Sequence, residues 1–133
     1  MLYKHQYQFS KRVEMIDITY QIKKDLKESN IKNGIIVVYT PHTTAGITIN
    51  ENADSDVVRD MINSFERAFP TSHPDYRHFE GNSHSHIKST IFGASQTLIT
   101  SEGKIILGIW QSVYLCEFDG PRNRTYYVKI IEG

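Results

Sequence analysis

The chain has 133 residues with 15 basic and 15 acidic side chains, so its formal net charge is zero. This length predicts one domain over residues 1–133 with a buried core, and the balanced charge argues against nucleic-acid binding, which needs many cations to contact phosphates. The longest apolar run, residues 35–39, is too short to cross a membrane, no apolar signal segment opens the chain and one cysteine permits no internal disulfide, so we expect a cytoplasmic protein.

The first fifty residues predict strands around one amphipathic helix. Alternating polarity or β-branched runs between turn residues indicate strands over residues 2–9, 34–40 and 46–50. Within residues 17–29, Ile18, Ile22 and Leu26 recur every four positions and predict a helix with one apolar face.

A second and stronger helix pattern covers residues 54–69, where the apolar positions form a broad stripe. Asp54 or Asp56 is expected to cap its N-terminus, because carboxylates there accept hydrogen bonds from free backbone N–H groups. Residues 70–83 predict a loop, long enough to indicate a functional segment. A short helix is expected over residues 87–92, where Gly93 closes it.

The last third of the chain predicts almost only strands, over residues 96–100, 104–118 and 126–131, with a hairpin turn at 101–103. Two main helices and one short helix interrupt the strands without a regular βαβ alternation. We therefore expect an α+β fold of mostly antiparallel sheets arranged as a sandwich.

A cluster of histidines indicates a binding site. Four of the six histidines, His73, His78, His84 and His86, fall within fourteen residues, and His42 follows the second predicted strand. Neutral imidazole is a common ligand for zinc, and three imidazoles with a water describe an open catalytic zinc site. If residues 83–86 are extended, His84 and His86 point the same way. The alternative is that these histidines are exposed in loops and hydrogen-bonded to the backbone.

Acidic and hydroxyl side chains surround this pattern. Glu51 or Glu80 is a candidate to orient a metal ligand or to act as a general base. The hydroxyl-rich segment of residues 40–46 suits contact with an anion, or a bend that satisfies its own backbone. Oxygen ligands near residue 54 would suit magnesium, although helix capping explains them equally, and Asp60 is left open.

Residues of the C-terminal third supply further candidates. Arg122 or Arg124 is placed to clamp a phosphate, or else lies solvated at a turn. Trp110 is expected in the core or at a subunit interface rather than against a ligand. Cys116 alternates with aromatic residues in a strand and is expected to be inert packing.

Several motifs together resemble one known family. They are His42-Thr43-Thr44-Ala45-Gly46, Asn50-Glu51-Asn52, Tyr76-Arg77-His78, His86-Ile87-Lys88-Ser89, Gly108-Ile109-Trp110-Gln111 and the segment 117–124. In this order, over nearly the whole chain, they are similar to the YjbQ family. The resemblance implies a compact α+β fold and a homotrimer. It also implies that His42, His78 and His86 surround a metal, expected to be zinc, or an anion. Some members lack a histidine at the position of His84, which is therefore only a secondary ligand.

The family name in use, secondary thiamine-phosphate synthase, implies a weak ability to join a pyrimidine diphosphate to a thiazole phosphate. We accordingly expect a metal-dependent enzyme for small phosphorylated substrates, with zinc or magnesium as the ion. Glu51 or Glu80 would move a proton, and Lys88 or Arg122 would neutralise phosphate. Two alternatives stay open: a metal-assisted phosphoester hydrolase, and a non-catalytic trimer that binds a ligand or a metal.

Overall fold

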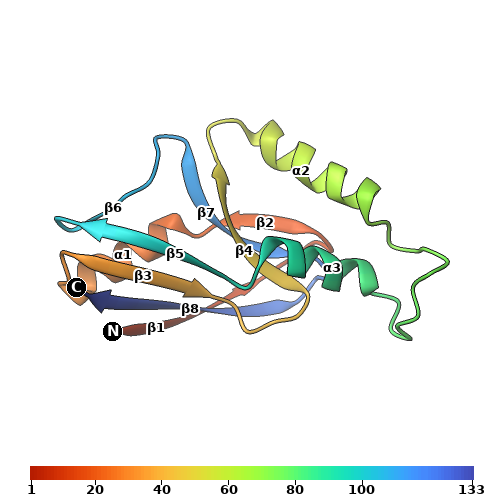
Figure 1. Cartoon of the computed structure of the whole chain (residues 1–133), viewed down its shortest axis with the longest axis horizontal. Coiled ribbons are helices and arrows are strands. Elements are labelled where there is room, and N and C mark those ends of the chain that lie inside the picture. Colours follow the sequence, from red (N-terminus) through yellow and green to blue (C-terminus); the bar gives the residue numbers. More distant parts are fainter.

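The computed structural model describes all of residues 1–133, in which eight strands and three helices follow one another along the chain (Figure 1). Their order is β1 (Leu2–Gln8), β2 (Glu14–Asp17), α1 (Thr19–Ser29), β3 (Gly34–Tyr39), β4 (Ala45–Glu51), α2 (Ser55–Ala68), α3 (Ser83–Phe92), β5 (Ser95–Ser101), β6 (Lys104–Ile105), β7 (Gln111–Glu117) and β8 (Asn123–Glu132). None of the three helices combines the length and the apolar character that spanning a bilayer requires.

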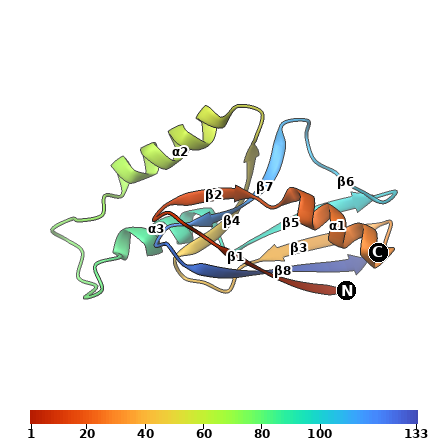
Figure 2. The same ribbon diagram turned by 180° about the vertical axis from the view of Figure 1, so that it is seen from behind.

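The strands form two antiparallel sheets. One has five strands in the order β1-β8-β3-β5-β6, and the other has three in the order β2-β7-β4. Because every pairing is antiparallel and the helices are inserted between strands, the α+β fold expected from the sequence is confirmed. Figure 2 shows that α1 lies alongside the five-stranded sheet, near the end where both chain termini lie.

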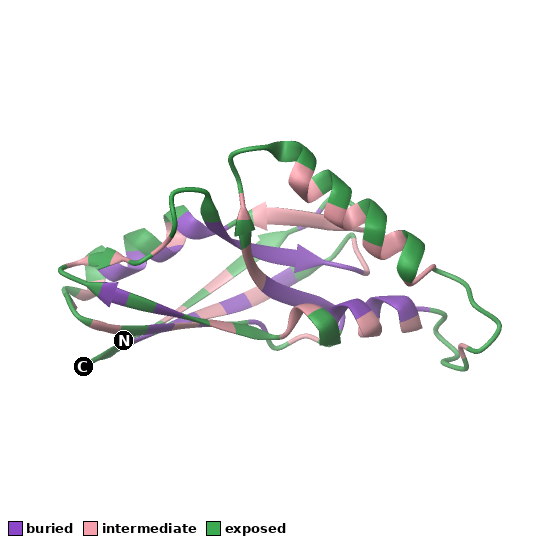
Figure 3. Cartoon of the chain, turned by 45° about the horizontal axis from the view of Figure 1, so that its top comes forward, coloured by how far each residue is buried: buried purple, intermediate pink, exposed green.

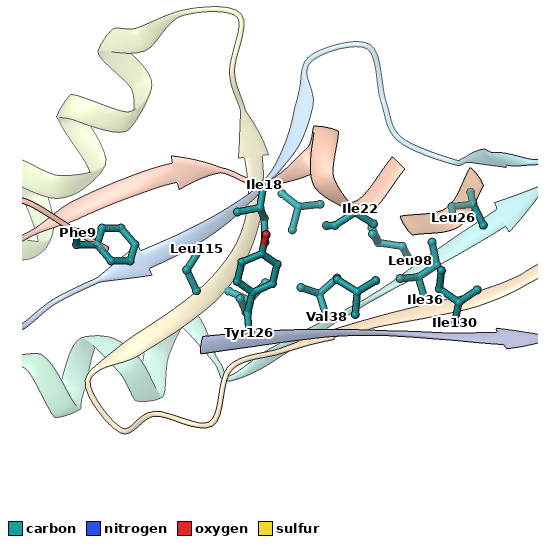
Figure 4. Packing of buried hydrophobic residues seen from close by; sticks show 13 residues of the cluster. Phe9, Ile18, Ile22, Leu26, Ile36, Val38, Leu98, Leu115, Tyr126 and Ile130 are labelled. Carbon is teal, nitrogen blue, oxygen red and sulfur yellow. The ribbon is translucent and has the colours of Figure 1, made fainter. Parts of the chain in front are cut away.

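The hydrophobic core lies between the five-stranded sheet on one side and β7, β4 and α1 on the other (Figure 4). Ile22 and Leu26 of α1 reach it, as their four-residue spacing predicts. The side chains of β3 alternate between the two faces of the sheet. Ile36 and Val38 point to the core and are buried, whereas Ile35 points to the outer face and is exposed. Val113 and Leu115 of β7 cover this layer from the opposite sheet.

Two predicted elements differ clearly from the structure, and the short strand β2 was not predicted. The expected strand over residues 104–118 is two strands, because a turn at residues 106–110 interrupts it: the N–H of Gln111 donates to the carbonyl of Gly108 at 3.0 Å, and its side-chain Oε1 accepts from the N–H of Gly108 at 2.7 Å. Trp110 stands at this turn with 62% of its surface exposed, so it is not in the core, and the alternative of a subunit interface stays a prediction.

The short helix also differs from its prediction. α3 begins at Ser83 rather than at residue 87, and so includes both His84 and His86. Side chains two positions apart on a helix diverge by about 200°. The segment is helical and not extended, so the expectation that these two rings point the same way was wrong. His84 is buried at 3% exposure, whereas His86 is only half-buried.

α2 is packed differently from the other two helices. Asp54 caps it as expected, since its carboxylate accepts from the N–H of Asp56 at 2.9 Å. The apolar stripe of α2 faces the rest of the molecule, but no residue of this helix is fully buried. In Figure 3 the helix is accordingly pink and green, the colours of half-buried and exposed residues, along its whole length. By contrast, α3 presents a buried face toward β4 (Figure 3).

Candidate functional site

The connection between β3 and β4 holds His42 in a fixed position. Thr40 anchors its start, because the Thr40 N–H donates to the carbonyl of Ala94 at 2.9 Å and its hydroxyl donates to the carbonyl of Thr125 at 2.7 Å. The N–H of Thr125 in turn donates to Nε2 of His42 at 3.0 Å. The imidazole is therefore tied to the first residues of β8.

This contact settles which nitrogen of His42 can act. A ring nitrogen that accepts a hydrogen bond carries no proton, so the neutral ring carries its proton on Nδ1 and can donate from there. Burial lowers the pKa of His42, and the positive charges of Arg124 and Arg122 lower it further against the opposing effect of Glu117. His42 is thus held neutral, with one donor for a ligand that accepts hydrogen bonds.

His42 and His86 line the same hollow, which we call the His42 hollow. Its volume is about 390 Å³, and its lining also includes Thr43, Ser89 and Thr90. The hydroxyl of Ser89 already donates to the carbonyl of Ala45 at 2.6 Å, and that of Thr90 donates to the carbonyl of His86 at 3.0 Å. Thr43 therefore offers the hydroxyl that these contacts leave available.

His86 also lines a second hollow, which we call the His78 hollow. Its volume is about 460 Å³, and Tyr76, Arg77, His78 and Ser83 line it together with Asp75 and Ile87. The ring centroids of His78 and His86 lie 5.4 Å apart in an edge-on arrangement. Arg77 is exposed and makes no ion pair, so its guanidinium is available to an anionic ligand.

The donor set was tested against the metal site that the resemblance implies. Zn–N bonds of 2.0–2.1 Å place the centroids of two imidazoles on one ion about 5 Å apart, so the separation of His78 and His86 fits two ligands. His42 does not supply a third in its present state, because Nε2 accepts a hydrogen bond and Nδ1 carries the proton. No three His, Cys, Asp or Glu side chains come together in a metal-binding group. A three-imidazole site therefore does not fit a single copy of this chain.

His84 and Lys88 lie away from both hollows, on the buried side of α3. Lys88 is 1% exposed and its ammonium donates to the carboxylate of Glu66 at 2.6 Å, with Nδ1 of His84 at 3.2 Å. Burial lowers the pKa of His84, and the charges of Lys88 and Arg12 lower it further. In this arrangement Lys88 neutralises Glu66 rather than a ligand in the hollows.

The carboxylates named from the sequence lie in different places. Glu80 is in the loop beside His78, where its Oε1 lies 3.9 Å from Nε2 of that ring. Glu51 ends β4, and six residues of strand at about 3.3 Å each separate it from the loop of His42 by roughly 20 Å. Asp60 is 72% exposed on α2 and contacts only Arg59, at 3.3 Å.

Neither of the two arginines near β8 lines either hollow. Arg122 is 53% exposed and its guanidinium contacts Asp119 at 3.0 Å. Arg124 is buried, and its Nε donates to Glu117 at 2.7 Å while its terminal nitrogen donates to the hydroxyl of Thr44 at 2.7 Å. No sequence pattern indicated this pairing, because seven residues and a turn separate the two partners.

Nearly the whole chain is similar to known proteins. The family model described as UPF0047 protein YjbQ-like matches residues 4–133. UPF0047 protein YugU of Bacillus subtilis is 52% identical over 98% of this chain and 99% of its own length. A UPF0047 protein of Methanocaldococcus jannaschii is 53% identical over 98% of this chain and 94% of its own length.

Solved structures agree in fold over the same extent. A crystal structure of an uncharacterised YjbQ/UPF0047 protein from Clostridium acetobutylicum is 50% identical, covers 97% of this chain and 99% of that one, and superposes with a TM-score of 0.95. A YbjQ-like protein of unknown function from Sulfolobus solfataricus is 30% identical, covers 100% and 97% of the two chains, and also has a TM-score of 0.95.

Proposed function

Because the chain belongs to the UPF0047 YjbQ-like family, we propose that it is an enzyme for small phosphorylated molecules, with an activity similar to that of secondary thiamine-phosphate synthase. One observation carries the proposal: His86 stands between two hollows in which most polar lining groups donate hydrogen bonds or carry positive charge, and Asp75 of the His78 hollow is the one carboxylate among them. Phosphoryl oxygens are acceptors only, so such a lining favours them over neutral or cationic ligands.

The proposed reaction is a displacement at a pyrimidine methylene. The thiazole nitrogen forms a bond to that carbon, the bond from carbon to the diphosphate oxygen breaks, and diphosphate leaves with the electron pair. The barrier falls when charge that develops on the leaving group is stabilised. Arg77 and the Nδ1–H of His42 are the groups of this chain best placed to do so, and Thr43 adds a hydroxyl at the mouth.

The proposal keeps a divalent ion, bound by His78 and His86 with further ligands from outside this copy of the chain; two imidazoles favour zinc over magnesium, which prefers oxygen ligands. Bound there, the ion would add positive charge beside the diphosphate. Elemental analysis of protein purified without a histidine tag tests this part alone. We expect close to one zinc per chain, lost in His78→Ala. Protein that holds no divalent metal would remove the ion from the proposal and leave the substrate unchanged.

The function is tested by supplying both thiamine precursors and following thiamine phosphate. We expect product from the wild type and a loss of about 100-fold or more in a His42→Ala, His86→Ala double variant, as is usual when groups that stabilise developing charge are removed. Tyr20→Ala is the control, since Tyr20 is an exposed ring on α1 that lines neither hollow. Equal turnover in the wild type and the double variant would reject the assignment.

The same assay separates the two alternatives. A phosphoester hydrolase would release phosphate from one precursor without the other, and a binding protein would retain a precursor without any product. Under both alternatives the hollows still bind a phosphorylated molecule, but the two precursors are not joined. A homotrimer is also part of the proposal and is argued below from the outer face of the sheet.

A further inference from the structure

A third hollow, with unpaired positive charge, lies at the other end of the molecule from His42, His78 and His86. α1, the turn after it and the β5–β6 hairpin enclose a volume of about 450 Å³. α1 and this hairpin lie near each other at the end opposite α3 in both views (Figures 1 and 2). We call it the basic hollow, and its four charged lining residues are Lys23, Lys27, Lys32 and Lys104.

No carboxylate neutralises these four lysines. None of them takes part in an ion pair, either with an acidic side chain or with the C-terminal carboxylate. Asp25 on the same helix is buried and contacts His5 instead, at 2.6 Å. Glu102 stands on the hairpin next to the hollow but makes no ion pair either. Four ammonium groups around one concavity repel one another unless an anion is bound among them.

The floor of the basic hollow is apolar. Leu26 is 3% exposed and belongs to the core, while Ile31 and Ile105 are partly buried and pack against the same core. Lys23, Leu26 and Lys27 share one face of α1, because positions three and four apart are neighbours on a helix. A ligand here would therefore meet charge at the rim and hydrocarbon beneath it.

The walls are held in place without any ligand. The N–H of Gly103 donates to the carbonyl of Lys32 at 2.9 Å, and the N–H of Glu102 donates to the side chain of Asn33 at 3.1 Å. On the other side, the left-handed backbone of Asn30 ends α1, and its N–H donates to the carbonyl of Lys27 at 3.3 Å. A preformed hollow binds with little loss of conformational entropy.

We propose that the basic hollow binds a small amphipathic anion, one phosphate or carboxylate group attached to an apolar chain or ring. The rim of lysines takes the anionic group and the floor of Leu26, Ile31 and Ile105 takes the apolar part. A bilayer surface is a poorer fit, because the apolar residues lie at the bottom of a concavity and not on a protruding ridge. This site is separate from the histidines and does not depend on the function proposed for them.

The probe for this site is octyl phosphate, titrated below its micellar range into the whole protein and followed by ¹⁵N amide shifts. Saturable shifts are expected at residues 23–32 and 102–105, with none at His42, His78 or His86. Inorganic phosphate and uncharged octyl glucoside are titrated separately, and each should bind at least about tenfold more weakly because each engages only half of the site. Binding of inorganic phosphate as tight as that of octyl phosphate would overturn the amphipathic assignment.

The variant that tests the rim is Lys27→Gln, and its matched control is Lys24→Gln. Both remove one positive charge from α1, but Lys24 lies about 60° from Lys27 and about 100° from Lys23 round the helix, and it does not line the hollow. We expect Lys27→Gln to weaken octyl phosphate binding roughly tenfold and Lys24→Gln to weaken it less than twofold. Equal weakening by the two variants would overturn the proposal. So would a protein that sediments with anionic vesicles but shows no saturable binding of octyl phosphate. Both side chains are exposed, so folding is unaffected.

Discussion

At the scale of single residues, the buried pair of Glu117 and Arg124 fixes the place where His42 stands. Glu117 is fully buried and Arg124 is 4% exposed. Arg124 donates to the carboxylate through two nitrogens and also reaches the hydroxyl of Thr44, two residues beyond His42. The next residue of β8, Thr125, donates to the imidazole itself. One ion pair thus ties β7, β8 and the β3–β4 connection together.

Removal of one partner of this pair should be costly. Arg124→Met leaves a carboxylate buried without a counter-ion, and we expect it to lower the free energy of unfolding by about 3–5 kcal/mol. The double variant Glu117→Leu, Arg124→Met removes both charges and should regain most of that loss. Urea unfolding followed by circular dichroism measures both. Arg122→Met is the control, because its exposed pair with Asp119 should contribute at most about 1 kcal/mol.

At the scale of elements, α2 is held to the body by few contacts, and Glu66 supplies the strongest of them. Its carboxylate accepts from Lys88 of α3 at 2.6 Å and from Arg12 at 2.9 Å. Burial alone would raise the pKa of Glu66, but the hydrogen bonds and charges of Lys88 and Arg12 outweigh it, so the pKa lies below the usual 4.5. Phe65 adds an aromatic contact to Phe92, with ring centroids 5.0 Å apart.

Acid should loosen α2 through this group. A carboxyl whose pKa is lower in the folded chain stabilises it fully above pH 4.5, the ordinary value, and less as the pH falls through the folded pKa. Glu66→Gln should therefore lower the free energy of unfolding by about 2–3 kcal/mol near neutral pH, since Lys88 then lacks its counter-ion. Near pH 3 the difference from the wild type should be much smaller. A difference that stays constant between the two conditions would contradict this role.

The same elements show how far sequence patterns reach. Apolar periodicity and β-branched runs predicted α1 and α2 and the strands β1, β3 and β5 to within a few residues, because each turns one apolar face toward the rest of the molecule. The start of α3 could not be found that way, since its buried face is polar. Ser85 is fully buried there because its hydroxyl donates to the carbonyl of Phe118, and Ser89 because it donates to Ala45. Such partners are distant in sequence and leave no periodic trace.

The candidate site was predictable in part for the same reason. The histidine cluster and the β3–β4 connection were recognisable from residue type, and His42, His78 and His86 do line two adjoining hollows. The sequence could not show which nitrogen of His42 carries the proton, because Nε2 accepts from the backbone N–H of Thr125, eighty-three positions along the chain. Arg77 was missed as a candidate, although its place beside His78 was a signal for it.

At the scale of the whole molecule, the outer face of the five-stranded sheet is unusually apolar for a surface. Ile35 lies directly opposite Ile99 on β5 and Ile131 on β8 in the strand register. The three are 39%, 58% and 44% exposed, and Ile106 beside them is 60% exposed. The inner face of the same strands fills the core, so no element of this chain covers the outer row, and an apolar row of this kind is typical of an interaction surface.

The homotrimer that belongs to the proposal would supply this layer from other copies. Ile99→Lys places a charge in the middle of the apolar row, and an interface cannot bury an unpaired ammonium without a loss of several kcal/mol. We expect light scattering after gel filtration to give a trimer for the wild type and a monomer for Ile99→Lys at the same concentration. Tyr20→Lys is the control, because Tyr20 is 80% exposed on α1, which packs on the inner side of the sheet. A trimer that survives Ile99→Lys would place the subunit contact elsewhere, and α2, whose apolar stripe is only half-covered, would then be the next surface to test.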